Sequence, residues 1–301
     1  MTKEIVLITG AGGMVAKELS AMLSDRYSIR FLTRKKRNDD GYEWDIDSKT
    51  IDLEALKGVS HIIHLAGTNI AEGRWTAARK KAIYDSRVKS AEILLEGIKS
   101  LKMKVKTFVS SSATGYYGTQ TTPKIYTEND AAGTGFLSEI CVAWEAVADA
   151  FLAEGVAGRV VKIRSGVVLS PNGGLVQKML PLVKFGLGTS LGSGKQYLPW
   201  IHSTDLCRMY RYAIENKQLE GAVNGVAPQH ITNQEFTKMM GLVLHRSVWL
   251  PSVPSFLLKW IFGELSVTFL EGSRVSADKI LNAGFEFEYP EVDKALENIV
   301  G

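Results

Sequence analysis

Cysteine is scarce in this sequence: Cys141 and Cys207 are the two present, and they lie far apart. That spacing excludes a disulfide framework and a metal knuckle, and it suits a reducing compartment. The first ten residues, MTKEIVLITG, lack the basic flank, long apolar core and cleavage site of a secretory signal. We therefore expect a cytoplasmic protein without a structural metal.

Long uninterrupted apolar runs are also missing. The most apolar late segment, residues 250–270, is broken by Pro254, Lys259 and Glu264, so we expect no membrane partner. Nor does one sign of charge dominate, because 36 basic and 32 acidic residues leave a formal net charge of +4. That balance is too mild to indicate nucleic acid. What is present is 301 residues, 45% of them hydrophobic, which is enough for a large core.

Strand-like apolar runs alternate with helical patterns through the first half of the chain. The expected strands are 4–10, 29–33, 60–67, 105–112 and 158–169, and the expected helices include 77–98 and 136–152. Alternation of this kind, with continuously apolar strands, predicts an α/β fold: a Rossmann-type doubly wound parallel sheet.

The rhythm changes after about residue 168. Residues 186–196, GLGTSLGSGKQ, are rich in glycine and are interpreted as a mobile lid. Thr232 and Glu235 form a capping-box pattern ahead of an apolar helical face. We expect residues 1–164 to form the nucleotide-binding domain, with parts of the later chain returning to it. Residues 165–301 would then form a smaller C-terminal α/β lobe that holds the substrate.

The glycines after the first strand form the first functional motif. Gly10, Gly13 and Ala16 fit the spacing G-x-x-G-x-x-[GA] between a strand and a helix. Such a turn lets the backbone approach a pyrophosphate, which the amides at the helix N-terminus bind. The motif predicts a dinucleotide site made by the turn and first helical residues, which are Gly10, Gly12, Gly13, Met14 and Val15.

The end of the second strand indicates which dinucleotide is bound. Thr33 and Arg34 stand where an acidic residue would favour NAD, and a guanidinium there pairs well with a 2′-phosphate. We therefore predict NADP(H). Lys36 and Arg37 belong to the same basic run and are interpreted as a solvated face. Asp45 is either a partner of the adenine amino group or an ordinary loop carboxylate.

Several motifs taken together resemble the extended short-chain dehydrogenase/reductase family, which includes sugar-nucleotide epimerases. They are TGAGGMVA at 9–16, HLAG at 64–67, FVSSSATGYYG at 108–118 and WIHSTDL at 200–206. Further stretches, among them SRV at 86–88, GSGKQYLPWIH at 192–202 and AGFEF at 283–287, look like one atypical subgroup. Its members carry an extra C-terminal region and are sometimes labelled cell-division inhibitors.

The resemblance implies a bound nicotinamide dinucleotide and a small-molecule substrate in the cleft beneath the C-terminal lobe. Leu65, Ala66 and Gly67 would line the cofactor near its ribose and nicotinamide half, and Ser110 is placed with them. Ser112 matches the serine that hydrogen-bonds the reacting oxygen in the family. The helices expected around 77–98 and 138–152 resemble those that pair in family dimers, so a homodimer is a further expectation.

The acid/base pair of the family is absent from this sequence. In the family, a tyrosine stands four residues before a lysine that lowers its pKa. Counting back from Glu145, or forward from Ser112, puts Leu137 at the tyrosine and Cys141 at the lysine. Leucine cannot donate a proton and a thiol does not replace an ammonium. Cys141 is either a reactive nucleophile or, as buried helical cysteines more often are, inert packing.

Other side chains could take part in the chemistry. Tyr116 or Tyr117 could donate a hydrogen bond to a carbonyl, and Tyr116 is our candidate beside Ser112; a structural aromatic is the alternative. Without a lysine, its pKa should stay near about 10, which makes a poor base at neutral pH.

Several other residues are weaker candidates. Arg74, Trp75 and Arg87 are either contacts of an anionic or aromatic substrate or ordinary surface and core residues. His61 and His64 lie three apart on a strand and point to opposite faces, so they cannot share a metal.

Two functions remain open. One is an NADP(H)-dependent oxidoreductase or epimerase-like enzyme of atypical chemistry. The other is a non-catalytic NADP(H)-binding sensor or regulatory protein, which the missing tyrosine and lysine favour.

Overall fold

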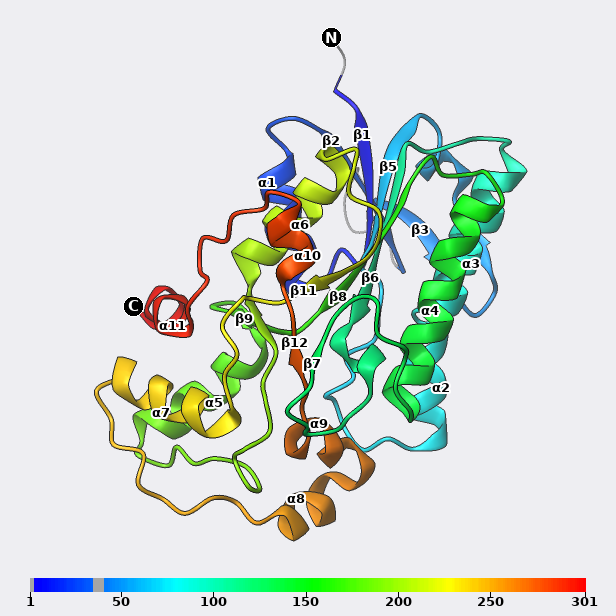
Figure 1. Ribbon diagram of the computed structural model, residues 1–301. Helices are drawn as coiled ribbons and strands as arrows, with labels where there is room; N and C mark the ends of the chain where they lie inside the picture. The colour runs from blue at the N-terminus through cyan, green and yellow to red at the C-terminus, as the bar shows by residue number, and fades with distance from the viewer. Residues whose placement is uncertain (1–2, 35–40) are drawn as a thin grey trace.

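A sheet of eight strands forms the centre of the computed structural model, which describes residues 3–34 and 41–301 (Figure 1). All neighbouring strands are parallel except the last pair, β3 and β4, at one edge. In spatial order the strands are β11 (Gly221–Gly225), β8 (Val160–Ser165), β6 (Thr107–Ala113), β5 (Val59–His64), β1 (Ile5–Thr9), β2 (Ser28–Thr33), β3 (Gly41–Asp45) and β4 (Thr50–Ile51). This order confirms the predicted doubly wound sheet.

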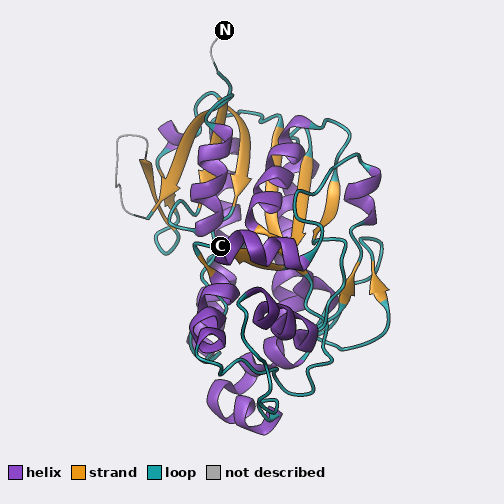
Figure 2. Cartoon of the chain, turned by 90° about the vertical axis from the view of Figure 1, so that its left-hand side faces the viewer, coloured by secondary structure: helices purple, strands orange, loops and turns teal. Residues whose placement is uncertain are grey.

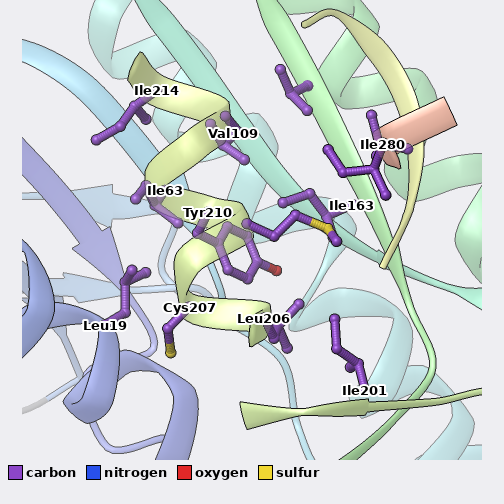
Figure 3. Packing of buried hydrophobic residues seen from close by; sticks show 14 of the residues in the cluster. Leu19, Ile63, Val109, Ile163, Ile201, Leu206, Cys207, Tyr210, Ile214 and Ile280 are labelled. Atoms are coloured by element: carbon purple, nitrogen blue, oxygen red, sulfur yellow. The ribbon is translucent and has the colours of Figure 1, made fainter. Parts of the chain in front are cut away.

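The central strands are apolar throughout because both faces of the sheet are covered. Along β1, Val6 and Ile8 enter one core while Leu7 enters another on the opposite face. Helices α1 (Met14–Leu23), α6 (Ser203–Glu215) and α10 (Asp278–Asn282) cover the first face, and α3 (Val88–Ser100) and α4 (Phe136–Ala153) cover the second. Figure 3 shows Cys207 and Tyr210 of α6 packed among apolar residues of the first face.

A smaller lobe follows the sheet domain and has its own core. The elements that share this core are β9 (Val167–Ser170), β10 (Trp200–His202), α5 (Gly174–Lys184), α7 (Asn233–Val243) and α11 (Val292–Val300). The neighbouring α8 (Ser255–Phe262), η3 (Gly263–Ser266) and α9 (Val267–Leu270) instead pack with residues of α2 (Ala77–Asp85) and α4 in a separate apolar cluster. Figure 2 shows the helices of the lobe gathered below the large sheet. The remaining elements are η1 (Leu53–Ala55), η2 (Thr114–Tyr117), β7 (Ile125–Tyr126) and β12 (Arg274–Val275). The predicted capping box is present, because Thr232 and Glu235 hydrogen-bond each other's backbone at the start of α7.

The prediction of one helix over 77–98 is wrong, because α2 and α3 are separate helices. At the break, Ser86 Oγ donates to the carbonyl of Ile83 in α2 and accepts the amide of Thr68 from outside the helix, each at 3.0 Å. Arg87 then starts α3 as its N-cap residue.

The single strand predicted over 158–169 also divides, at Gly166, into β8 and β9, which belong to different sheets. A Cβ at Gly166 would lie 2.5 Å from the Pro199 carbonyl oxygen, so the chain crosses between the sheets where only glycine fits. In the described part of the chain, no helix combines the length and apolar character that crossing a bilayer requires.

Candidate functional site

The glycine turn between β1 and α1 has the geometry that its sequence predicts. Gly10 adopts φ +74°, and a Cβ there would lie 2.9 Å from the Leu65 carbonyl oxygen. The Gly13 amide donates to the Gly10 carbonyl at 2.8 Å, and Gly13 is the N-cap of α1, with no side chain to satisfy the helix amides. A Cβ at Gly12 would meet nothing within 4 Å. The turn therefore leaves the α1 N-terminus open to a phosphate group.

Met14 and Val15, the other predicted residues of this turn, are the first two residues of α1 and are half-buried. Val15 packs against the core on its own face of the sheet. Because both side chains are partly buried, the groups that these two residues can offer a pyrophosphate are their backbone amides.

Thr9 ties this turn to the end of β5. Its Oγ1 accepts the amides of Leu65 and Ala66 at 3.0 Å each, which leaves its hydroxyl proton for His64 Nδ1 at 2.9 Å. His64 Nε2 then carries the ring proton and faces Ser90 Oγ at 3.1 Å. Burial lowers the pKa of His64 to about 4, which keeps the ring neutral. Sequence reasoning assigned no such role to Thr9 or His64, although both end strands beside the turn.

The residues predicted at the adenosine end lie at the ends of β2 and β3. Thr33 ends β2, and Arg34 follows it as an exposed side chain. Asp45 Oδ1 accepts the amide of Asp47 at 2.8 Å, and this backbone hydrogen bond is the main cause that lowers the pKa of Asp45. This local hydrogen bond matches the second alternative for Asp45, an ordinary loop carboxylate. Lys36 and Arg37 lie outside the described residues.

A cavity of about 420 Å³ opens between the sheet domain and the smaller lobe. The sheet side provides the ends of β5, β6 and β8 together with one face of α4, and the lobe side provides residues 197–199, 268 and 271–273. Among the predicted site residues, it is lined by Leu65, Gly67 and Ser112. Among the described residues, the glycine-rich segment 186–196 contributes no lining residue to this cavity, whereas Tyr197, Leu198 and Pro199, which follow it, do. The role of the segment as a lid stays a prediction.

Ser112 reaches the cavity from the end of β6 and is held from behind. Its Oγ donates to Glu145 Oε1 at 2.7 Å. Both Glu145 oxygens accept from Arg164, from Nε and Nη2 at 2.8 Å each, in a buried bidentate pair. Because its own proton points to Glu145, the Ser112 hydroxyl offers the cavity an acceptor. In the sequence, Glu145 served only to locate the positions of the missing pair, and no motif indicated a role for Arg164.

Ser110, two residues earlier on the same strand, is fully buried. Its Oγ donates to the backbone carbonyl of Ser111 at 3.0 Å. Its predicted contact with the cofactor stays a prediction.

The two positions of the missing pair both line the cavity, and neither side chain can move a proton there. Leu137 contributes an apolar surface. Burial, reinforced by the charge of Glu145, raises the pKa of the Cys141 thiol to about 11. Its Sγ lies 3.7 Å from the Ala113 carbonyl oxygen as a hydrogen-bond donor. Cys141 is therefore a protonated thiol at neutral pH, as the inert-packing alternative requires.

The two tyrosines contact Arg164, and the loop that carries them borders the cavity. The Arg164 guanidinium lies 3.4 Å from the centre of the Tyr116 ring. Tyr117 Oη donates to Asn224 at 2.7 Å, and burial raises its pKa to about 12. Neither ring is part of the cavity wall among the described residues. This placement matches the structural-aromatic alternative, and a direct role for Tyr116 stays a prediction.

Of the three weaker candidates, Arg87 lines the cavity, whereas Arg74 and Trp75 make structural contacts. Arg74 donates to the backbone carbonyls of Trp260 and Ile261. The Trp75 indole donates to the Ile70 carbonyl at 2.9 Å within a separate apolar cluster. Arg87 lines the cavity. Over the described ranges, 3–34 and 41–301, no three His, Cys, Asp or Glu side chains form a possible metal site.

The family model described as NAD dependent epimerase/dehydratase family matches residues 6–225. The chain belongs to this family. A second model, Domain of unknown function (DUF1731), matches residues 253–299. The two matches confirm the predicted resemblance to an atypical, extended short-chain dehydrogenase/reductase with an additional C-terminal region.

Relatives of this family match along nearly the whole chain. Epimerase family protein Mb2239 of Mycobacterium bovis is 38% identical over 299 residues, covering 98% of this chain and 97% of the relative. Human epimerase family protein SDR39U1 is 31% identical, covering 98% and 99%. The crystal structure of human SDR39U1 (isoform 2) with NADPH superposes with a TM-score of 0.86 at 29% identity, covering 98% of each chain.

Proposed function

We propose that this protein binds NADP(H) on the glycine turn and uses it in oxidoreduction or an epimerase-like reaction of a small molecule in the cavity. The observation that carries the proposal is that the glycine turn lies against a wall of the cavity. Gly10 packs against the backbone of Leu65, and Leu65 and Gly67 line the cavity. A dinucleotide whose pyrophosphate lies on the α1 N-terminus would thereby extend directly into the space beside Ser112.

The choice of NADP(H) over NAD(H) rests on Arg34. It follows β2 as an exposed cation, where a 2′-phosphate of the adenosine ribose would lie. Support comes also from the human SDR39U1 structure, which contains NADPH.

The chemistry follows from what the cavity wall offers. When bound, the cofactor supplies or accepts a hydride. Ser112, with its proton committed to Glu145, would accept a hydrogen bond from a substrate hydroxyl and so orient that oxygen. Neither Leu137 nor Cys141 supplies an acid or base at neutral pH. The proton of the reaction would then come from water or from the substrate itself.

A second candidate function is a non-catalytic NADP(H)-binding sensor. The observation that favours it is the same pair of positions: an apolar side chain and a buried thiol stand where proton transfer would be needed. The two candidates share the cofactor and differ in turnover.

Two measurements test the proposal. Calorimetry on ligand-stripped protein should detect binding of NADPH that is tighter than that of NADH. NADPH oxidation should then be followed across a panel of carbonyl compounds, and interconversion of isomers, which leaves the cofactor unchanged, should be followed by NMR across a panel of sugar nucleotides. Both assays include Ser112→Ala and, as a matched serine far from the cavity, Ser20→Ala. Turnover that Ser112→Ala abolishes and Ser20→Ala retains supports the enzyme. Tight cofactor binding with no turnover that depends on Ser112 supports the sensor, and no binding of either nucleotide refutes both.

A further inference from the structure

Arg87 is the positive charge in the cavity wall, and it has no acidic partner. Its Nη1 donates to the carbonyls of Thr68 and Ile83 at 3.1 Å each. Among the described residues, Nε and Nη2 make no hydrogen bond to the protein, and no carboxylate lies within ion-pair distance of the guanidinium. Burial lowers the pKa of Arg87 to about 10, as expected for a cation without a counter-charge. The side chain stays charged at neutral pH and has two donor groups to spare.

The guanidinium has a fixed place in the wall. Its Cζ lies 5.3 Å from the centre of the Trp144 ring. The backbone of Gly67 also lies against it, because a Cβ at that position would be 3.0 Å from Cζ. The charge also acts on Cys141, whose thiol pKa it lowers, although burial raises that pKa more. Arg87, at the start of α3, therefore places a cation beside Cys141. Cys141 stands at the α4 position where the family has its lysine.

The expected path of the dinucleotide leads to this place. The strand order reverses at β1, with β2 on one side and β5 on the other, and ligands of such sheets lie across that point. The pyrophosphate belongs at the α1 N-terminus and the adenosine ribose at the end of β2. The other half of the cofactor then lies over the end of β5, where Gly67 leaves its backbone bare beneath the guanidinium.

We propose that Arg87 binds the two adjacent hydroxyls of the ribose in the nicotinamide half of NADP(H). This inference rests on the proposed binding of that cofactor. A planar guanidinium with two free donors matches a pair of neighbouring acceptor oxygens, which an ammonium does less well. With the ribose held there, its charge would disfavour the cationic oxidised ring relative to the neutral reduced one. Arg87 thus holds the cofactor and biases the site toward NADPH.

The test compares the whole cofactor with its adenosine half. NADPH, NADP⁺ and 2′,5′-ADP are titrated calorimetrically into wild type, Arg87→Gln and Arg87→Lys. Arg87→Gln should weaken NADPH about ten- to hundredfold, the loss typical of hydrogen bonds to a charged group, and should leave 2′,5′-ADP within about twofold. NADP⁺ should lose less affinity than NADPH, and Arg87→Lys should recover part of the loss. Arg74→Gln, which removes an arginine that is not part of the cavity wall, should change none of the three.

Each other result has a defined meaning. NADPH that binds Arg87→Gln as tightly as wild type overturns the inference and leaves the proposed function standing. Equal losses for NADPH and 2′,5′-ADP also overturn it, because they indicate a general defect. Wild type that binds neither nucleotide overturns the proposed function, and this inference with it. If thermal unfolding shows that Arg87→Gln does not fold, Arg87→Lys carries the comparison, with a smaller loss expected for NADPH alone.

Discussion

Ser112 and Glu145 are joined by a 2.7 Å hydrogen bond in which the serine is the donor. The same carboxylate oxygen accepts from Arg164 Nε at 2.8 Å, so one oxygen bonds both a serine of the cavity wall and a buried arginine. The serine that faces the substrate space is thus held by a buried ion pair on neighbouring elements.

Breaking that ion pair should be costly to stability. Glu145→Gln would leave the Arg164 charge buried with no counter-charge, and we expect the free energy of unfolding to fall by about 3–5 kcal/mol. Urea unfolding followed by circular dichroism measures the change. The matched control is Glu154→Gln, which removes an exposed carboxylate paired with the exposed Lys99 at 2.6 Å, where we expect a loss below about 1 kcal/mol. Similar losses for the two variants would contradict the role given to the buried pair.

Both cysteines should resist alkylation in the folded protein. Burial raises the pKa of the Cys141 thiol to about 11 and shifts that of Cys207 upward as well. Cys207 is in addition enclosed between α1 and α6 (Figure 3). Intact-mass spectrometry after iodoacetamide treatment at neutral pH should show no adduct on native protein and two adducts after unfolding in guanidinium. Rapid modification of native Cys141 would restore the reactive-nucleophile interpretation.

The neutral state of His64 should make stability depend on pH. Its folded pKa is about 4 against an ordinary value of 6.5. Between these values the unfolded chain binds a proton that the folded protein does not, so stability falls as pH falls. Between pH 7 and pH 5 the expected loss from this group is about 2 kcal/mol. Urea unfolding at both pH values should show a smaller pH-dependent loss in His64→Gln than in wild type; equal losses would assign the effect to other groups.

Arg34 should decide between the two nicotinamide cofactors. Arg34→Ala removes the cation expected to pair with the 2′-phosphate, so NADPH should bind about ten- to hundredfold more weakly while NADH is nearly unaffected. Calorimetric titration of both nucleotides into wild type and variant measures this difference. If the substitution weakens NADH as much as NADPH, Arg34 has no part in selecting the phosphate.

The sequence predicted those features that depend on local patterns. The parallel sheet follows from apolar strands such as β1, and the glycine turn from the need for a positive φ at Gly10. The breaks at Ser86 and Gly166 were missed because each is imposed by a contact distant in sequence, with Thr68 in one case and Pro199 in the other.

The site itself was predictable only in part. Ser112 and the positions of the missing pair could be placed from motifs. The pairing of Glu145 with Arg164 could not, because the two residues come from a helix and a strand and no periodic pattern connects them. Arg87 could be named as a candidate, but its lack of a counter-charge depends on how α3 begins after the break.

The C-terminal stretch matched by its own family model, residues 253–299, does not pack as a separate body. Val275, Ile280 and Phe285 join the core against α6, while Val292 and Leu296 of α11 close the core of the lobe. The stretch is recognisable as a unit of sequence, yet its side chains complete the cores of other parts of the chain. A shortened chain ending before it would open two cores to water at once, so this region cannot be treated as a removable module.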